Sequence, residues 1–205
     1  MSQLDEIVQQ RKSVRSYDPN YTIAKEEIEK LLRLASEAPS SSNLQPWRVI
    51  VIKNKELQKE LRAIGNNQAQ IEESSAVVAI LGDSEAYKNA EEIFNQNVAE
   101  GHVSQEIANN TIKNTLNFYP NVPEETRKLI AAYDAGAFAM QFMLLAKDRG
   151  YDTVTMGGFD KEKFAKRFDL PANVFPITLI AIGKAQAPAF GTSRVPVESF
   201  TTFYE

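Results

Sequence analysis

The chain has 205 residues, enough for one large domain or at most two small ones. Its residues are 43% hydrophobic and 24% charged, as in an ordinary soluble globular protein. The net charge is −4 and there is no cysteine, which excludes disulfides, thiolate catalysis and cysteine-based metal centres.

Periodic apolar positions predict the first elements. Ser2 and Asp5 have the spacing of a capping box, which begins a short helix ending near Gln10. Residues 24–37 carry apolar side chains at i, i+3, i+4 and i+7, the pattern of an amphipathic helix, and Pro39 follows its end. Further along, the sequence predicts a strand, a helix and a second strand at 48–53, 55–64 and 76–81.

The second half is organised around one long helix. Residues 84–118 are polar and acidic, which indicates one or two exposed helices. A helix should then run from Pro123 to Gly150, about 40 Å at 1.5 Å per residue. Because its centre is apolar on nearly every side, we expect burial all round, with a second subunit supplying part of the cover. A helix, a strand and a tail follow at 161–168, 175–183 and 185–205.

Strands and helices are interspersed along the chain, without repeats, low-complexity blocks or an obvious linker. This order favours an α+β fold over a doubly wound one. We therefore expect a single domain over residues 1–205. The tail should either be disordered or lie along another surface.

Charge and hydropathy also restrict the partners. Residues 71–126 carry 2 Lys or Arg against 10 Asp or Glu, so the chain lacks the concentrated basic face of a nucleic-acid-binding protein. The N-terminus is polar, and the apolar run at 135–146 falls short of the about 20 residues that a membrane span needs. We expect no nucleic acid and no membrane as partners, and a cytoplasmic location.

The single histidine, His102, lies in a polar run without a nucleophile motif beside it. A general base needs an oriented partner, so we expect an ordinary surface residue and no metal site. An oxidoreductase whose cofactor supplies the chemistry is compatible with so few reactive side chains.

Three short segments carry groups suited to a ligand. Arg11 and Arg15 should point the same way in an extended segment, with the Ser13 hydroxyl between them, which suits a phosphate, although a solvated basic turn is an alternative. Gly157 and Gly158 allow backbone to approach a planar ligand, although a glycine pair also marks plain turns. The run Ala-Pro-Ser-Ser-Ser-Asn-Leu-Gln-Pro-Trp at 38–47 places three hydroxyls, two amides and the only tryptophan between apolar elements.

These segments resemble the nitroreductase family of FMN-dependent NAD(P)H oxidoreductases. The order and spacing agree over about 1–83 and 123–200, whereas residues 84–122 match poorly. The matching residues are Arg11-x-Ser13-x-Arg15, the run 38–47, Asn67-Gln68, Met156-Gly157-Gly158-Phe159 after the long helix, and Ser193-Arg194.

The resemblance implies a central mixed β-sheet flanked by helices, a long helix buried in a homodimer interface, and a C-terminal tail embracing the partner subunit. It implies FMN bound in a cleft made from both subunits, with NADH or NADPH as electron donor. Residues 84–122 would then be a variable helical excursion over the active site, and 185–205 a C-terminal extension.

Roles near FMN follow from the same resemblance. Arg11, Ser13 and Arg15, joined by Arg194, would hold the phosphate and ribityl chain, and Asn67 would face the pyrimidine edge. The glycine pair would present N–H groups near N5 and O4 of the ring. The full set assigned to the cofactor is Arg11, Lys12, Ser13, Arg15, Pro39, Ser40, Ser41, Asn43, Asn67, Gln70, Met156, Gly157, Gly158 and Arg194.

The partner subunit would supply Pro39, Ser40 and Ser41 to the isoalloxazine, with Asn43 supporting them and Trp47 anchoring their loop to the core. Some family members have a lysine at the position of Gln70, and others at that of Thr192. Because both differences weaken the positive field near the flavin, the choice between NADH and NADPH stays open.

The implied reaction passes a hydride from NAD(P)H through flavin N5 to a nitroaromatic, a quinone or a related small electron-poor compound, in a ping-pong cycle. It needs no catalytic protein side chain. Phe118 or Tyr119 could stack on the substrate, with ordinary packing as the alternative. The same scaffold also supports enone reduction, dehalogenation or dehydrogenation, and a non-catalytic FMN-binding or redox-sensing protein is the other alternative.

Overall fold

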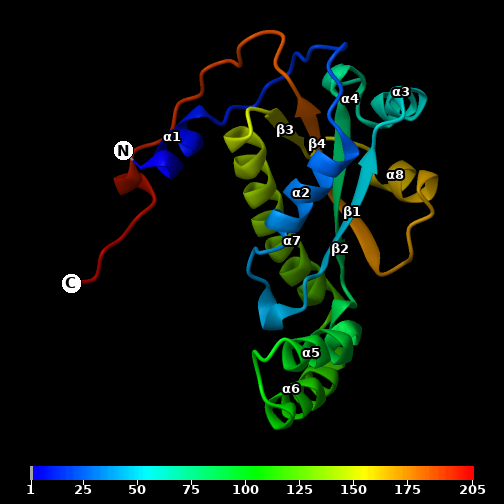
Figure 1. Cartoon of the computed structure of the whole chain (residues 1–205), viewed down its shortest axis with the longest axis vertical. Coiled ribbons are helices and arrows are strands. Elements are labelled where there is room, and N and C mark those ends of the chain that lie inside the picture. The colour runs from blue at the N-terminus through cyan, green and yellow to red at the C-terminus, as the bar shows by residue number, and fades with distance from the viewer. Residues whose placement is uncertain (1) are drawn as a thin grey trace.

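The computed structural model describes residues 2–205, and its centre is a four-stranded antiparallel sheet with helices on both faces (Figure 1). The strand order is β1-β2-β4-β3. The strands are β1 (Trp47–Ile52), β2 (Ala76–Asp83), β3 (Asp152–Met156) and β4 (Val174–Gly183).

The pairing corrects one detail of the sequence prediction, which was a mixed sheet. All three pairs of neighbouring strands are antiparallel. β2 and β3 run in the same direction, but β4 lies between them, so they do not pair. Within residues 2–205, the parallel pairing is limited to a bridge between Ser13 and Thr153.

The helices largely follow the predicted ranges. Ser2 caps the first helix through reciprocal bonds with Asp5, and Asn54 and Asp160 cap two others. They are α1 (Gln3–Gln10), α2 (Lys25–Ala35), α3 (Lys55–Ile64), α4 (Gln70–Glu73), α5 (Ala90–Ala99), α6 (Gln105–Phe118), α7 (Glu124–Asp148) and α8 (Lys161–Arg167). Short 3-10 turns are η1 (Ser41–Asn43), η2 (Ala86–Asn89), η3 (Tyr119–Asn121) and η4 (Val197–Ser199).

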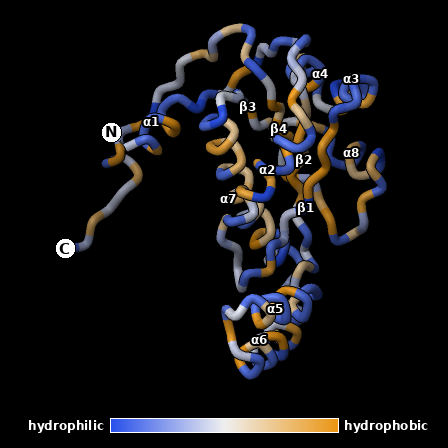
Figure 2. The backbone as a smooth tube through the Cα atoms, viewed as in Figure 1, coloured by the Kyte–Doolittle hydropathy of each residue, from blue (hydrophilic) through white to orange (hydrophobic). Residues whose placement is uncertain are grey.

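The sheet separates two hydrophobic cores. Successive residues of a strand point to opposite faces, so β2 contributes to both. Val78 and Ile80 belong to the core that includes α2 and α7, whereas Val77 and Ala79 belong to the core that includes α3 and α8. All of β2 is buried, which explains why its sequence is apolar from Ala76 to Leu81 (Figure 2).

Helix α7 packs one face against the sheet and α2. By length and composition this helix could cross a membrane, yet Phe138 and Phe142 are buried in the core of the domain. On its other face, Leu129 is 72% and Tyr133 79% exposed. Burial all round, as the sequence predicts, therefore requires a surface from outside this chain.

Two segments extend from the body. The pair α5–α6 lies at the end of the molecule opposite α3 and α4, and the tail after β4 runs past α1 and away from the sheet (Figure 1). The predicted exposed helices in 84–118 are thus confirmed as two. In the tail, Phe200 is 69% and Phe203 79% exposed, so these rings are uncovered in one chain.

Candidate functional site

The basic segment at the N-terminus lies along the edge of β3. Val14 donates its N–H to the Thr153 carbonyl at 3.1 Å, next to the bridge between Ser13 and Thr153. Arg15 is exposed, with one guanidinium nitrogen 3.4 Å from the Ser13 carbonyl. Lys12 is also exposed and Arg11 half-buried, so cationic side chains border this strand edge.

The loop after α3 is fastened to the glycine pair that follows β3. Asn66 and Gln68 both donate side-chain N–H groups to the Gly158 carbonyl, at 2.9 and 3.1 Å. Gln70 is buried and donates to the Gln68 side-chain oxygen at 3.1 Å. Asn67 is exposed, and its side-chain oxygen accepts from Arg62 at 2.9 Å.

Hydrogen bonds to three consecutive carbonyls fix the peptide planes around the glycine pair. The Met156 carbonyl accepts from the Thr178 hydroxyl at 3.1 Å, and the Gly157 carbonyl accepts from the Phe159 N–H at 3.2 Å. The Gly158 carbonyl holds the two amides described above. In a trans peptide the N–H points opposite the carbonyl, so the N–H directions of Gly157 and Gly158 are set as well. The Met156 side chain itself is buried.

Gly157 faces open space. A Cβ built at this residue meets nothing within 4 Å among the described residues, and its φ lies outside the left-handed region. Packing and backbone conformation within one chain therefore give no reason for a glycine here. A flat ligand lying against the backbone would give one, because only glycine permits such a close approach.

The serine-rich run forms a second, tightly bonded loop. Ser40 Oγ accepts from the Gln45 N–H at 3.0 Å, and the Gln45 side chain donates to the Asn43 carbonyl at 3.2 Å. Pro39 is exposed. The predicted anchoring by Trp47 is confirmed, since its ring stacks on Phe138 of α7 with centroids 5.2 Å apart.

Unusual backbone conformations gather in these two loops. A non-glycine residue with positive φ is uncommon, and such residues cluster at functional sites. Within residues 2–205 there are six, of which Asp169 is the only one outside the two loops. The other five are Ser42, Asn43, Gln45, Asn66 and Asn67.

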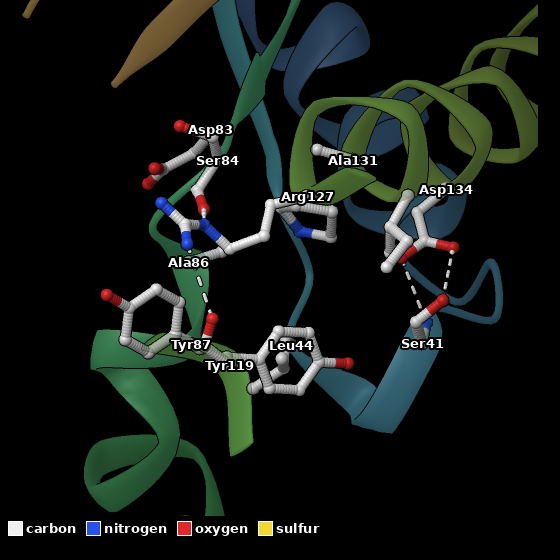
Figure 3. Close-up of a pocket in the computed structure, with 12 residues that line it drawn as sticks. Ser41, Leu44, Asp83, Ser84, Ala86, Tyr87, Tyr119, Arg127, Ala131 and Asp134 are labelled. Atoms are coloured by element: carbon white, nitrogen blue, oxygen red, sulfur yellow. Dashed lines mark hydrogen bonds between the residues drawn. The ribbon is translucent and has the colours of Figure 1, made fainter. Parts of the chain in front are cut away.

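A buried carboxylate on α7 holds the serine-rich loop (Figure 3). Asp134 is 2% exposed and accepts from both the N–H and the hydroxyl of Ser41, at 2.9 and 3.2 Å. Burial raises the pKa of Asp134 above its ordinary value, while the bonds from Ser41 oppose this shift. A cavity of about 20 Å³ lies beside the pair, large enough for one water.

The two aromatic candidates differ in exposure. Tyr119 is buried and its ring stacks on Tyr87, whereas Phe118 is 63% exposed. The Tyr119 hydroxyl lies 3.2 Å from Ser42 Oγ, which joins the excursion to the serine-rich loop. Phe118 and Ser42 border a surface hollow of about 260 Å³. The Phe118 ring meets the Tyr119 ring edge to face, with centroids 5.3 Å apart, yet it stays largely exposed, whereas Tyr119 is held in packing.

The serine-rich loop lies far from the basic segment within one chain. Trp47, at the end of the loop, pairs with Gly82 of β2. Thr153, beside the basic segment, lies level with Ala76 of β2 through its pairing with β4. These two β2 positions are six residues apart, about 20 Å at 3.3 Å per residue. One chain thus joins Gly158, Gln68 and Gln70 by hydrogen bonds and places Ser13 beside Thr153 of the same edge strand, but it does not bring Pro39–Asn43 to the basic segment.

The remaining candidates have local surroundings. Arg194 donates to Thr192 and to the Ser193 carbonyl, both within its own tail segment. His102 is confirmed as a surface residue, with a side chain 64% exposed and 3.1 Å from Glu100.

Sequence reasoning missed Asn66 and Asp134, which hold the two loops, and Arg127, which donates to carbonyls at both ends of the helical excursion. A signal was present for Asp134, because it is the only charged residue in the apolar stretch 129–146. Asn66 follows Gly65 at the end of a helix, and Asn tolerates the left-handed conformation. For Arg127, one charge among many on a helix gave no such signal.

Known proteins resemble the chain over almost its whole length. A sequence model described as the nitroreductase family matches residues 8–184. YodC of Bacillus subtilis, which is named as an NAD(P)H nitroreductase, is 41% identical over 97% of each chain. An enone reductase of CLA biosynthesis from Lactiplantibacillus plantarum is 30% identical over 98% of this chain and 94% of its own. Among solved structures, a nitroreductase from Exiguobacterium sibiricum in complex with FMN superposes with a TM-score of 0.95 at 36% identity, covering 100% of this chain and 98% of the other.

Proposed function

Since the chain belongs to the nitroreductase family, we propose that it reduces nitroaromatics, quinones or a related small electron-poor compound in a cleft shared by two subunits. The protein is an NAD(P)H-dependent oxidoreductase that uses FMN. FMN, when bound, supplies hydride transfer between NAD(P)H and the acceptor at N5, so the two reactants use one cleft in turn.

The observation that carries this proposal is the open space at Gly157, bounded by backbone whose direction is fixed. The carbonyls of Met156, Gly157 and Gly158 all accept hydrogen bonds, so the N–H groups of the glycine pair are held in place before a ligand arrives. Donors fixed in advance stabilise negative charge without reorganisation. This chemistry suits the N5 and O4 edge of a flavin ring.

The basic segment suits the other end of the cofactor. Arg11, Ser13 and Arg15 offer charge-assisted hydrogen bonds to a phosphate beside β3. Arg194 would join them, and Asn67 would face the pyrimidine edge. Gln68 donates to the Gly158 carbonyl and Gln70 donates to Gln68, so neutral hydrogen-bonding groups lie beside the glycine pair.

The separated serine-rich loop supports a site built from two copies of the chain. Pro39, Ser40 and Ser41 lie about 20 Å from the basic segment along the sheet of their own chain, by the strand spacing. A second copy that covers the exposed face of α7 would bring its serine-rich loop to the first copy's glycine pair. On the substrate side, the exposed ring of Phe118 offers a surface for stacking an aromatic acceptor.

A second candidate activity is enone reduction. It is favoured by the enone reductase from Lactiplantibacillus plantarum, which matches this chain over nearly its full length at 30% identity. The two activities share the flavin and differ in the acceptor. Oxidation of NADH measured with a nitroaromatic, a quinone and an enone in turn separates them. We place the protein in the cytoplasm, where NAD(P)H is available.

The first experiment is the visible spectrum of the purified protein before and after NADH is added without oxygen. We expect a flavin band that bleaches promptly. A band that persists with both NADH and NADPH would favour a non-catalytic FMN-binding protein. Absence of the band, even after incubation with FMN, would contradict the proposed function altogether.

A further inference from the structure

The carboxylate of Asp134 is an unusual group for the place it occupies. It lies in the apolar stretch of α7 and is 2% exposed. Burying a carboxylate is unfavourable unless hydrogen bonds compensate for the lost water. The bonds found for it in the described chain come from one residue, Ser41, whose N–H reaches Oδ2 and whose hydroxyl reaches Oδ1. Both carboxylate oxygens therefore serve to fix one position of the serine-rich loop.

That position is the start of η1. Ser40 precedes this turn but makes no side-chain capping bond to it, because its Oγ accepts from the Gln45 N–H instead. Asp134, 93 residues away in the chain, accepts the first N–H of the turn, which has no partner within the turn itself. A side-chain oxygen that accepts such an N–H stabilises the start of a helical turn.

The residues that follow Ser41 need this support. Ser42 and Asn43 have φ values of 53° and 55°. Strained conformations of this kind persist only when the surroundings determine them. The anchors on either side are the Asp134–Ser41 pair and the Ser42–Tyr119 contact at 3.2 Å. Without Asp134, the loop would be held on the Tyr119 side and at Trp47 but not at its first turn.

We propose that Asp134 is a positioning residue for the cofactor site: acting through Ser41, it holds the edge Pro39–Ser41 in the position from which that edge contacts the flavin. This inference rests on the proposed function. The inference adds a residue of α7 to the determinants of FMN binding. The side chain of this residue, Asp134, is buried and bonds to the loop, so it would act on the cofactor only through Ser41. A role in folding alone would alter stability and leave the affinity for FMN unchanged.

The test uses the full-length apoprotein titrated with FMN and followed by flavin fluorescence. Asp134→Ala removes both bonds, and we expect FMN affinity to fall about tenfold. Asp134→Asn should recover affinity to within about threefold of the wild type, because its amide oxygen accepts the Ser41 N–H and its NH₂ donates to Ser41 Oγ. Such a rescue distinguishes positioning of the loop from a need for negative charge.

Two further variants complete the design. Ser41→Ala keeps the N–H bond and loses the hydroxyl bond, so a fall of about threefold is expected. Adding it to Asp134→Ala should cause no further loss, because residues that act together are not additive. The matched control is Arg149→Met, which removes an ion pair of 2.8 Å between the end of α7 and Glu27 of α2, away from the loop. Its FMN affinity should equal that of the wild type.

Wild-type affinity for FMN in Asp134→Ala, with or without a lower melting temperature, would overturn the inference and leave the proposed function standing. If Asp134→Ala fails to fold, Ser41→Ala decides, and unchanged affinity in that variant would likewise overturn it. A wild-type protein that binds no FMN would overturn the proposed function, and this inference with it.

Discussion

At Gly157, the stability of the folded chain and the affinity for FMN can be tested separately with one substitution. A methyl group at this position meets nothing within 4 Å in the described chain. Gly157→Ala should therefore leave the apoprotein as stable as the wild type, or more stable by about 0.4–1 kcal/mol, because the unfolded chain loses freedom. The same methyl group occupies the space proposed for the flavin ring, so FMN affinity should fall at least about tenfold.

The comparison residue for this prediction is Gly183, where an added methyl group should lower the stability of the fold. A Cβ there would lie 3.0 Å from the Tyr17 ring and 3.2 Å from the Ser75 nitrogen. Gly183→Ala should lower the melting temperature in calorimetry through this crowding. If Gly157→Ala bound FMN as tightly as the wild type, the open space would not be a flavin site.

At the scale of elements, the α5–α6 unit depends on one guanidinium from α7 (Figure 3). Arg127 donates to the carbonyls of Ser84, Tyr119 and Val122 at 3.0, 3.3 and 2.6 Å, so it joins both ends of the excursion. It also lies over the Tyr87 ring, 5.6 Å from the centroid. A single side chain thus closes the loop that carries both helices.

Arg127→Met keeps much of the apolar stem and leaves these three carbonyls without their donor. Unsatisfied buried acceptors cost about 1–3 kcal/mol each, so we expect local opening of α5–α6 to become easier by about 3 kcal/mol, with hydrogen exchange faster by about 100-fold. Amides of β2 and β4 should exchange as in the wild type. Lys88→Met, which removes an exposed ion pair with Glu85 in the same unit, is the control. Equal acceleration throughout the protein would contradict this anchoring role.

Elements with local signals were predictable from the sequence, and those that depend on distant contacts were not. Helix α3 has the predicted bounds because Asn54 caps it and Gly65 ends it. Strand β3 was missed because Asp152 and two threonines interrupt its apolar pattern, and pairing with β4 makes it a strand. Within the candidate site, the motifs predicted which segments would hold the cofactor. The Asp134–Ser41 pair joins residues 93 positions apart, which no local spacing reveals.

For the whole molecule, the uncovered apolar surface and the divided site lead to the same expectation, a homodimer. On α7, Leu129 and Tyr133 are 72% and 79% exposed, and on α1 Leu4 is 59% exposed. Between these two helices lies a groove of about 730 Å³. Large exposed apolar side chains gathered on neighbouring helices are typical of an interface. Light scattering should therefore give a mass near twice the 22.9 kDa of one chain.

A substitution that prevents dimer formation should also weaken FMN binding. Tyr133→Glu places a charge on the exposed face of α7, at a side chain that takes part in none of the hydrogen bonds described for the two loops, and should yield a folded monomer with FMN affinity reduced at least about tenfold. The control is Val51→Glu, at a residue of β1 that is 37% exposed, which should remain dimeric. A monomer that kept full FMN affinity would mean that one chain houses the cofactor alone. Because the serine-rich loop lies about 20 Å from the basic segment of its own chain by the strand spacing, that outcome would contradict a site in which the partner subunit's loop contacts the ring.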